Sequence, residues 1–450
     1  MGDLRPNEPT LQVASTTTLS RRRWFAQWMV VFLLACAAAS AYLTRHCLAV
    51  ANTSIQSQIG CNNEQFGYLY GAFSLGYLIF QVPGGWVGQK LGTRFALPIF
   101  AVLWSIMTIF TALAMTLPVL IGIRFLFGLA QAGLVPNQAR ILLDWIPDSS
   151  RGTASSVLMV GMSVGAVASL SLTSILMGYF DWRSIFLAYS VIGMLWAFTF
   201  FVLFRATPAE VSWLCSPSPV NPESSSTITE AVVASDKLRL KTLLFHGSIW
   251  GLASMALFKA AGYNLLVTFL PALLQYAYAV PQDQTGGLTA WSMVAMVIGS
   301  MLGGAVVDFV QLRTSNKFYS RSGVGGLTLG LAAIFTLAAG FASTATGVAA
   351  LLAIASLFSG MAGASPWVAT MDIGGTSTGI VMGLMNSTSA LAGIAISPLV
   401  GRIVDEIKET NGNWSLVIWL HAAFYLVAAL CWLSVNPERT INSVGDGRAV

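Results

Sequence analysis

The stretch IGIRFLFGLAQAGLVPN, from Ile121 to Asn137, sets a single arginine inside an apolar run that carries no other charge. Arg124 and Gln131 are seven residues apart, so on a helix they lie on nearly the same face. Gly128 lies between them on that face and is expected to leave room beside the guanidinium. An arginine at the centre of a bilayer costs about 2.5–3.5 kcal/mol on insertion scales. We therefore expect Arg124 to face a polar cavity or a partner.

The composition predicts that most of the chain lies in a membrane. Of its 450 residues, 55% are hydrophobic and only 9% are charged, whereas soluble domains carry about 25% charged residues. Continuous apolar segments of about 20 residues recur from end to end, each long enough to cross a bilayer as a helix. This continuity excludes a β-barrel, whose strands alternate in polarity. The fold class predicted is an all-α membrane protein.

Twelve transmembrane helices are predicted, with one long polar segment between the sixth and the seventh. The spans are expected roughly at residues 26–51, 65–88, 95–115, 118–142, 152–179, 183–204, 246–278, 285–310, 324–343, 347–371, 378–404 and 414–435. Residues 205–244 are rich in proline and serine and are expected to form a flexible linker. The chain is thus divided into an N-terminal tail (1–23), a six-helix bundle (24–204), the linker (205–244), a second six-helix bundle (245–436) and a C-terminal tail (437–450).

The distribution of basic residues predicts how these spans are oriented. With the N-terminus in the cytoplasm, 17 of the 23 lysines and arginines fall on the cytoplasmic side, and the opposite face holds Arg183, Arg402 and Lys408. Cytoplasmic loops of membrane proteins carry the excess of basic residues, so both termini and the linker are predicted to be cytoplasmic. The net charge of +5 therefore indicates membrane orientation, and no nucleic-acid partner is expected.

Three cations, Arg45, Arg124 and Lys259, lie inside the predicted spans, whereas every acidic residue falls in a loop, a tail or the end of a span, Asp372 included. We expect the three cations to share one strongly positive cavity. The planar fork of arginine suits a carboxylate or phosphate, and lysine acts as a point charge. An anion that enters would supply the missing counter-charge, so the predicted substrate is an organic or inorganic anion. The alternative is that a cation reaches the membrane interface or binds backbone carbonyls.

The two halves of the chain repeat short motifs at a common offset. GGWVGQKLG, from Gly84, follows the second span, and GGAVVDF, from Gly303, ends the eighth. RATPAE, from Arg205, ends the sixth span, and NPER, from Asn436, ends the twelfth. These echoes predict two six-helix pseudo-repeats, the arrangement on which many secondary transporters are built.

GGWVGQKLGTR, from Gly84 to Arg94, resembles the loop signature that follows the second helix in the major facilitator superfamily. In that superfamily the usual acidic residue of this loop takes part in gating, but here Gln89 replaces it, while Asp308 keeps the acid in the second-half copy. The acidic partner of the first-half gating pair is therefore absent. The resemblance implies a gating role for Gly85, Lys90, Gly92, Arg94 and Asp308.

Further motifs, in the same order along the chain, resemble the anion:cation symporter family. They are YLTRHCLAVA (Tyr42–Ala51), GYLIFQVPGGW (Gly76–Trp86), RFLFGLAQAGLVPN (Arg124–Asn137), DWRSIF (Asp181–Phe186), RATPAE (Arg205–Glu210) and ISPLVGRI (Ile396–Ile403). That family includes bacterial hexonate and hexuronate transporters, vesicular glutamate transporters, sialin and sodium-phosphate transporters. The resemblance covers about Tyr42 to Arg439 and implies alternating access, with a cavity lined by the first, fourth, seventh and tenth helices.

The resemblance also implies roles for individual residues. Arg45 and Arg124 match arginines of the family's first and fourth helices, and Tyr77 matches a tyrosine that faces the sugar acid in the hexonate branch. Lys259 lies twelve residues before Pro271, where the glutamate branch has an arginine at the same distance before its proline.

Three further residues are weaker candidates for the site. Asn386 resembles a cavity asparagine of the family's eleventh helix, and Ser365 can supply a hydroxyl from the tenth, although helix packing is the alternative there. His46 adjoins Arg45, and its unperturbed pKa of about 6.5 makes it a candidate proton carrier. However, adjacent helical residues point roughly 100° apart, and a neighbouring arginine disfavours the imidazolium form.

Two positions depart from the family. The hexonate branch has an aspartate immediately before the first-helix arginine, where this chain has Thr44. Much of the family has a fourth-helix glutamate, in the pattern G-x-x-E, that takes part in proton coupling, and this chain has Gln131 in its place. A glutamine cannot release a proton, although its amide can donate to an anion and accept from Arg124.

We therefore predict a secondary active or facilitative transporter of an organic anion, such as a sugar acid or another carboxylate, without the family's usual fourth-helix proton carrier. A proton- or sodium-coupled symporter of a sugar acid or inorganic phosphate is the alternative, and a transporter-like anion sensor is an alternative of another class. No nucleophile–base pair, phosphate loop or metal-ligand spacing is found among the residues, so no enzyme activity, cofactor or metal is expected. The expected surroundings are a small anion and a lipid bilayer, for a functional monomer in the cytoplasmic membrane of a bacterium.

Overall fold

The computed structural model describes residues 9–205, 246–410 and 413–441, and nearly all of these residues are helical. The helices of the first half are α1 (Pro9–Val50), α2 (Asn52–Ile59), α3 (Asn63–Leu91), α4 (Thr93–Leu113), α5 (Leu117–Ala132), α6 (Leu134–Trp145), α7 (Arg151–Leu176) and α8 (Trp182–Leu203). Those of the second half are α10 (Gly247–Tyr276), α11 (Gln282–Thr314), α12 (Val324–Ala339), α13 (Ala345–Met361), α14 (Ala364–Gly374), α15 (Thr378–Thr410) and α16 (Ser415–Cys431). Short turns lie between them: η1 (Asp148–Ser150), η4 (Phe318–Gly323), η5 (Gly375–Ser377) and η6 (Trp432–Ser434).

The predicted class, an all-helical membrane protein, is confirmed. Within the described ranges, 10 helical segments are long and apolar enough to cross a membrane. One of these segments, Ala345–Ile394, covers α13, α14 and the start of α15, where two spans were predicted, and α3 is not among the 10. The number of twelve spans therefore stays a prediction.

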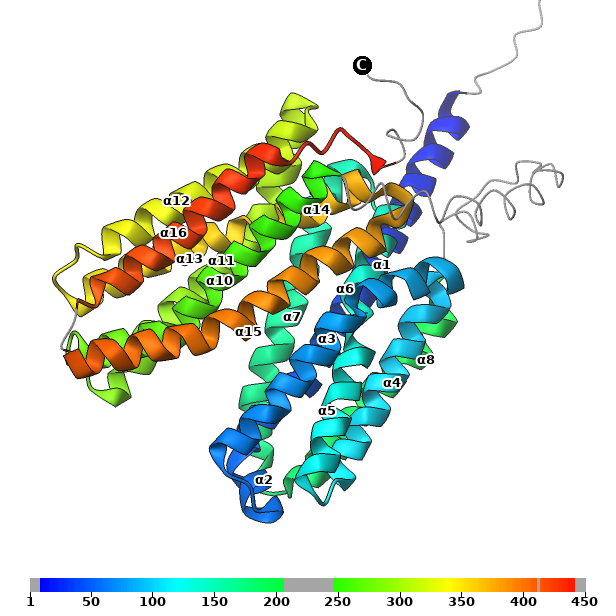
Figure 1. Ribbon diagram of the computed structural model, residues 1–450. Coiled ribbons are helices and arrows are strands. Elements are labelled where there is room, and N and C mark those ends of the chain that lie inside the picture. Colours follow the sequence, from blue (N-terminus) through cyan, green and yellow to red (C-terminus); the bar gives the residue numbers. More distant parts are fainter. Residues whose placement is uncertain (1–8, 206–245, 411–412, 442–450) are drawn as a thin grey trace, which may run out of the picture.

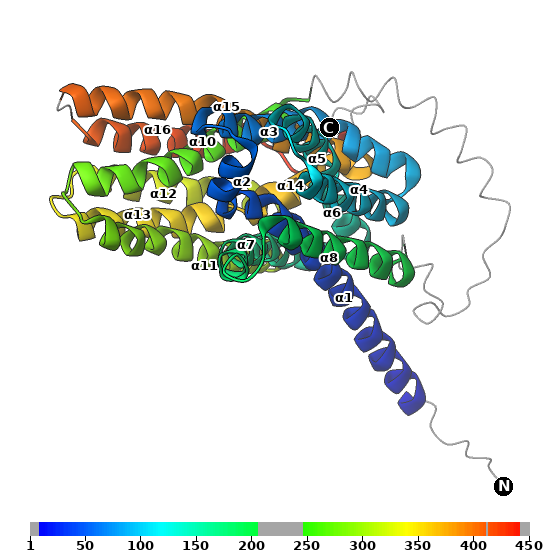
Figure 2. The same ribbon diagram turned by 90° about the horizontal axis from the view of Figure 1, so that it is seen from below.

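The first helix begins earlier than the sequence predicted. Residues 9–23, expected to belong to a tail, form the start of α1, which projects away from the body of the protein (Figure 2). The charged run from Arg21 to Arg23 did not end the helix, because lysine and arginine are good helix formers. Except for Arg205, the predicted linker 205–244 lies outside the described residues, and so do the ends of both predicted tails.

The helices form two bundles that meet at one end and diverge at the other (Figure 1). One buried apolar cluster contains residues of both bundles, such as Trp145 and Trp432. Two further clusters are confined to one bundle each, around Trp182 in the first and around Leu265 in the second. The shared core lies where the bundles meet, beside α14 and η6, and we call this the closed end; we call the opposite end, where the two cores are separate, the open end.

Small residues bring the bundles together at the closed end. α7 packs against α11, and α3 packs against α15. A Cβ atom added to Gly85 would lie 2.3 Å from the carbonyl oxygen of Gly379, and one added to Gly304 would lie 2.3 Å from that of Gly152. No larger side chain fits at such distances, which is why small residues are favoured where membrane helices pack closely.

Each bundle contains one helix that is interrupted by a glycine with a proline three residues later. Gly133 separates α5 from α6 and Pro136 follows, whereas Gly363 precedes α14 and Pro366 follows. A proline has no N–H to complete the helical bond to the preceding turn, so the helix bends there. In the first bundle, the side-chain amide of Asn137 donates to the Gly133 carbonyl oxygen at 2.6 Å. These matching breaks are further evidence for the internal repeat. They were not predicted, because the expected spans 118–142 and 347–371 were continuous.

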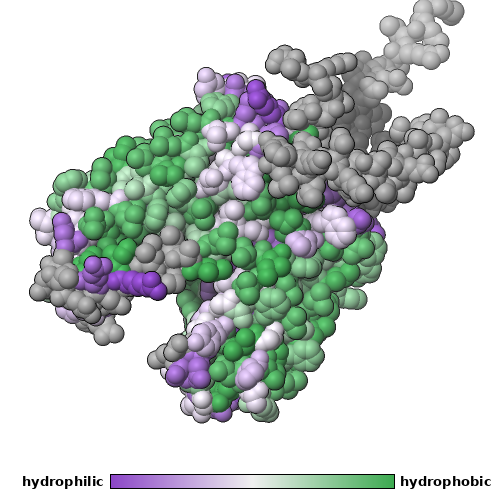
Figure 3. Space-filling model, viewed as in Figure 1, coloured by the Kyte–Doolittle hydropathy of each residue, from purple (hydrophilic) through white to green (hydrophobic). Residues whose placement is uncertain are grey.

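The surface agrees with a protein that lies within a bilayer. Apolar side chains cover the flanks of both bundles, hydrophilic ones gather at their ends, and the molecule is notched between the bundles at the open end (Figure 3). Large hydrophobic side chains such as Phe198, Leu327 and Phe32 are more than 60% exposed, which is stable only against lipid or another apolar surface.

Candidate functional site

Arg124 is buried in the first bundle, and the described residues supply no charged partner for it. Its side chain is 1% exposed, and its guanidinium lies 4.6 Å from the ring centre of Phe127 and 5.5 Å from that of Phe73. Its Nε has no hydrogen-bond partner in the part of the chain that the structure describes. Among the described residues, no carboxylate forms an ion pair with it. The ring faces stabilise the cation, but they do not neutralise it.

The sequence predicted that Gly128 leaves room beside the Arg124 guanidinium, but the structure places this glycine against the backbone of α3. A Cβ atom added there would lie 2.2 Å from the Phe73 carbonyl oxygen, and one added to Gly76 would lie 2.2 Å from that of Phe125. The two glycines therefore let α3 and α5 approach each other backbone to backbone. This close contact holds the Phe73 ring against Arg124, so Gly128 acts on the site through helix packing.

The shared helix face predicted that Gln131 binds Arg124, but the structure shows that it binds Arg45 instead. Its Oε1 accepts a hydrogen bond from Arg45 Nε at 2.9 Å. Its Nε2 donates to the Ala41 carbonyl oxygen at 2.9 Å and to Thr44 Oγ1 at 3.3 Å. The amide therefore joins α5 to α1 and holds Arg45 in place. Both donors of Gln131 are used within the protein, which leaves none for an incoming anion.

Aromatic rings enclose the guanidinium of Arg45. It lies 4.5 Å from the ring centre of Tyr42, 4.9 Å from that of Phe73 and 4.8 Å from that of Tyr77. Phe73 contacts both arginines, and it stacks on Tyr77 at 5.6 Å. The predicted residue Tyr77 is therefore in the cluster, whereas Phe73 and Tyr42 were missed. Phe73 lies one helical turn before Tyr77, and Tyr42 lies nearly one turn before Arg45. This spacing could have identified both residues from the sequence.

His46 lies beside this cluster. Its ring centre is 5.7 Å from that of Tyr42, the same ring that faces Arg45. Its role as a proton carrier stays a prediction.

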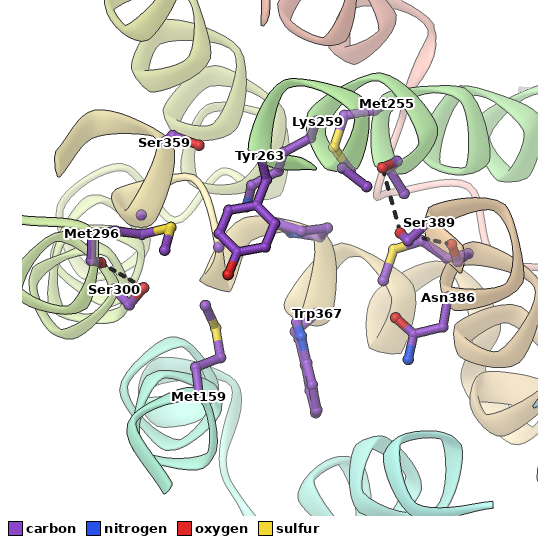
Figure 4. A pocket seen from close by; sticks show the side chains of 16 residues that line it. Met159, Met255, Lys259, Tyr263, Met296, Ser300, Ser359, Trp367, Asn386 and Ser389 are labelled. Carbon is purple, nitrogen blue, oxygen red and sulfur yellow. Dashed lines mark hydrogen bonds between the residues drawn. The ribbon is translucent and has the colours of Figure 1, made fainter. Parts of the chain in front are cut away.

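Lys259 lines a cavity of about 260 Å³ in the second bundle. α10, α11, α13, α14 and α15 supply most of the wall, and Met159 of α7 closes it from the first bundle (Figure 4). Asn386 also lines the cavity, whereas Ser365 does not; its neighbours Pro366 and Trp367 do. Ser365 is fully buried, and its hydroxyl has no hydrogen-bond partner within the described ranges.

The three cations are thus divided between the bundles instead of sharing one cavity wall. Neither arginine lines the cavity around Lys259. The sequence could name the cations, but which bundle face each one occupies depends on how the helices pack.

Asp308 binds the first turn of α7 across the boundary between the bundles. Its Oδ1 accepts from Gly152 N at 2.9 Å, and its Oδ2 accepts from Thr153 N at 2.7 Å and from Thr153 Oγ1 at 2.6 Å. The unsatisfied N–H groups and the positive dipole at a helix N-terminus favour such a carboxylate. The acid singled out in the second-half motif therefore lies at a contact that holds the closed end together.

The remaining gating candidates lie at the same end with different contacts. Lys90 Nζ lies 4.3 Å from the ring centre of Trp86 in its own helix, and Arg94 contacts the Phe201 ring of its own bundle at 5.5 Å. Gly92 has a positive φ of 79° between α3 and α4, a conformation that glycine adopts without strain. Among the gating candidates of the first half, Gly85 lies against the other bundle, at Gly379.

A network of ion pairs at the closed end was not predicted. Arg321, in the π-helical turn η4, is fully buried and binds Asp372 at 3.0 Å and Asp148 at 2.5 Å. Lys317 binds Asp372 at 2.9 Å, and Arg151 lies 3.7 Å from it. Asp148 and Arg151 belong to the first bundle and the others to the second, so the network crosses the boundary. The sequence placed these residues in loops and span ends, where nothing indicates partners more than 50 positions away.

Arg140 makes a separate contact across the boundary. Its Nη1 donates to the carbonyl oxygens of Thr376 at 2.9 Å and Gly375 at 3.3 Å, which lie just before α15. Its Nε is bound to Asp144 of its own helix at 2.9 Å. Arg140 of the first half therefore binds backbone carbonyls just before α15 of the second half. Conversely, Asp308 of the second half binds the start of α7 in the first half.

Known membrane transporters resemble this chain in sequence and in fold. A sequence model of the Major Facilitator Superfamily matches residues 34–398. The chain is 26% identical over 406 residues to a probable sulfoacetate transporter of Cupriavidus necator, covering 90% of this chain and 92% of the relative. It is 27% identical over 390 residues to a hexuronate transporter of Bacillus subtilis, covering 86% and 90%. In fold it resembles a proton:xylose symporter bound to 6-bromo-6-deoxy-D-glucose, with a TM-score of 0.71, 15% identity and coverage of 94% of this chain and 99% of that one.

Proposed function

We propose, for a chain that belongs to the major facilitator superfamily, that it moves a small organic anion across a membrane by alternating access. The chain is an integral multi-pass membrane transporter and not an enzyme. Two relatives are named for sulfoacetate and for hexuronate, which are both organic anions. A carboxylate or another small organic anion is therefore the substrate class that we infer.

The buried and unpaired charge of Arg124 is the observation that carries the proposal. Leaving a buried charge without its partner costs about 3–5 kcal/mol, and an anion from outside the protein would remove that cost. Arg45, held by Gln131 and by three aromatic rings, adds a second positive charge in the same bundle. Lys259 adds a third from the facing bundle. An anion bound between the bundles would touch both, which is what alternating access requires.

The arrangement of the bundles fits one state of the transport cycle. The closed end carries Arg140, Arg151, Lys317 and Arg321, and basic residues mark the cytoplasmic side of membrane proteins. We therefore infer a state open to the outside, with twelve spans and both termini in the cytoplasm. The bacterial relatives support the cytoplasmic membrane of a bacterium as its location. Because the two bundles of one chain supply all three cations, a monomer is sufficient for transport.

We infer that transport does not depend on a proton carrier in α5. Gln131 cannot titrate. Its hydrogen bonds to Arg45, Ala41 and Thr44 join α5 to α1 and hold Arg45 in place. The anion would then move by facilitated transport or by exchange, driven by its own gradient and the membrane potential. The potential contributes about 2.3 kcal/mol per elementary charge for each 100 mV.

Counterflow in reconstituted liposomes tests the proposal. Liposomes loaded with an unlabelled anion, from a panel that includes sulfoacetate, glucuronate, phenylacetate and phosphate, are placed in a trace of the same labelled anion. We expect accumulation of label for at least one organic anion, loss of it in Arg124→Gln, and no loss in Arg313→Gln, which changes an exposed arginine at the closed end. Binding without counterflow for every anion would instead show a sensor, and neither binding nor counterflow would reject the proposal.

A further inference from the structure

The side chains that line the cavity around Lys259 indicate the chemical nature of the uncharged part of the anion. Four methionines line it, Met159, Met255, Met296 and Met385, together with Trp367 and the ring of Tyr263. Figure 4 shows the Tyr263 ring projecting into the middle of the cavity, with Met159 and Trp367 on the side towards the first bundle. The large apolar side chains of the wall are therefore thioethers and aromatic rings, while Lys259 supplies its one positive charge.

Most hydroxyl groups in the wall are already engaged. Ser300 Oγ donates to the Met296 carbonyl oxygen at 2.9 Å. Ser389 Oγ donates to the carbonyl oxygens of Met385 at 3.3 Å and Ala256 at 3.4 Å. Ser359 is hydrogen-bonded to the Tyr425 side chain. These donors satisfy the protein itself, so few remain for a ligand rich in hydroxyl groups.

Three polar groups of the wall carry no hydrogen bond or ion pair that the described residues supply: the Lys259 ammonium, the Tyr263 hydroxyl and the Asn386 amide. A sugar acid has a hydroxyl group on nearly every carbon, and each one left unpaired in a buried site weakens binding. One ammonium, one hydroxyl and one amide suit a carboxylate with a single further polar substituent. Polyhydroxylated anions are therefore poorly matched to this wall.

The size and material of the cavity suit an aromatic ring. A dry cavity of about 150 Å³ is already large enough for benzene, and this one measures about 260 Å³. Thioether sulfur makes favourable contacts with ring edges, and methionine adapts to the shape of the bound group. The indole of Trp367 and the ring of Tyr263 add faces for stacking.

We propose that the second bundle selects an aromatic monocarboxylate, with the ring among the four methionines, Trp367 and Tyr263 and the carboxylate at Lys259. This rests on the proposed function, because it assigns the substrate of the same site. It narrows the substrate class from organic anions to those with a compact hydrocarbon ring. Hexuronates, which are anionic but covered with hydroxyl groups, are then poor ligands of this chain.

Calorimetric titration of the purified protein with phenylacetate and with glucuronate, at equal ionic strength, tests the assignment. We expect phenylacetate to bind at least tenfold more tightly than glucuronate. In Met296→Gln, which replaces the thioether with an amide of similar length, phenylacetate affinity should fall about tenfold, since an apolar contact is lost and a polar group is buried. Met296→Leu, which conserves volume and polarity, should change it less than about threefold.

The results that would overturn the assignment are distinct from those that would reject transport. Glucuronate binding as tight as that of phenylacetate, or equal effects of the Gln and Leu variants, would show that the wall does not select a ring. Counterflow of glucuronate that depends on Arg124, without binding of phenylacetate, would leave anion transport in place and reject the aromatic substrate. The comparison of the two ligands on the unchanged protein decides the matter even if Met296→Gln does not fold.

Discussion

Asp308→Asn should loosen the closed end without unfolding either bundle. The Asp308 carboxylate accepts three hydrogen bonds of 2.6 to 2.9 Å from Gly152 and Thr153. An asparagine at this position keeps one acceptor oxygen and loses the negative charge. The first turn of α7 then loses both a charge-assisted bond and the favourable interaction with its helix dipole.

The size of the effect follows from those contacts. A hydrogen bond to a charged group contributes about 1.5–3 kcal/mol, and a carboxylate at a helix N-terminus contributes about 0.3–1 kcal/mol more, or up to about 2 when partly buried. Because one acceptor remains, we expect a loss of about 2 kcal/mol from the closed arrangement. This corresponds to roughly a thirtyfold shift in its ratio to arrangements in which the ends separate.

Pulsed EPR distances across the closed end measure this shift. Spin labels at Leu91 of the first bundle and Thr314 of the second, both exposed, report how far apart the ends lie. We expect Asp308→Asn to add a population at longer distance. Asp181→Asn is the matched control, because Asp181 caps α8 by accepting from Arg183 N within a single bundle. An unchanged distance distribution in Asp308→Asn would refute the reasoning.

Three further changes test other contacts. Gln131→Glu should make uptake depend on pH, because a titratable carboxyl would then face Arg45 at about the 2.9 Å of the present hydrogen bond; a flat pH profile of uptake would contradict this. Arg45→Lys should weaken anion binding about tenfold, measured by calorimetry, since an ammonium lacks the planar fork that stacks among three rings; unchanged affinity would show that a point charge is enough. Arg321→Gln should lower the free energy of unfolding by about 3 kcal/mol, because it leaves the buried Asp372 carboxylate with fewer partners; a change below about 0.5 kcal/mol in chemical denaturation would exclude that role.

Much of the fold could be predicted because membrane helices are encoded locally. The expected spans 183–204 and 246–278 agree closely with α8 (Trp182–Leu203) and α10 (Gly247–Tyr276), since a run of apolar residues of the right length is itself the signal. The break at Gly133 was missed for the same reason, as the run stays apolar through Pro136 and its length does not reveal a bend.

The candidate site could be predicted only in part. Arg45, Arg124 and Lys259 stand out one by one, because a charge in an apolar run needs no structural context to be noticed. Their partners depend on packing between distant segments: Gln131 meets Arg45, 86 positions away, although it shares a helix face with Arg124. The division of the cations between two bundles, and the methionines around Lys259, likewise arise from which faces the bundles present to each other.

Uptake of a labelled organic anion into liposomes, with the membrane potential and the pH gradient set independently, tests the central claim most directly. The cation-only site with Gln131 in α5 predicts that an inside-positive potential drives uptake when no pH gradient exists. It also predicts that a pH gradient alone, with the potential held at zero, drives none. Uptake that follows the pH gradient at zero potential would contradict the account and show a proton-coupled symporter.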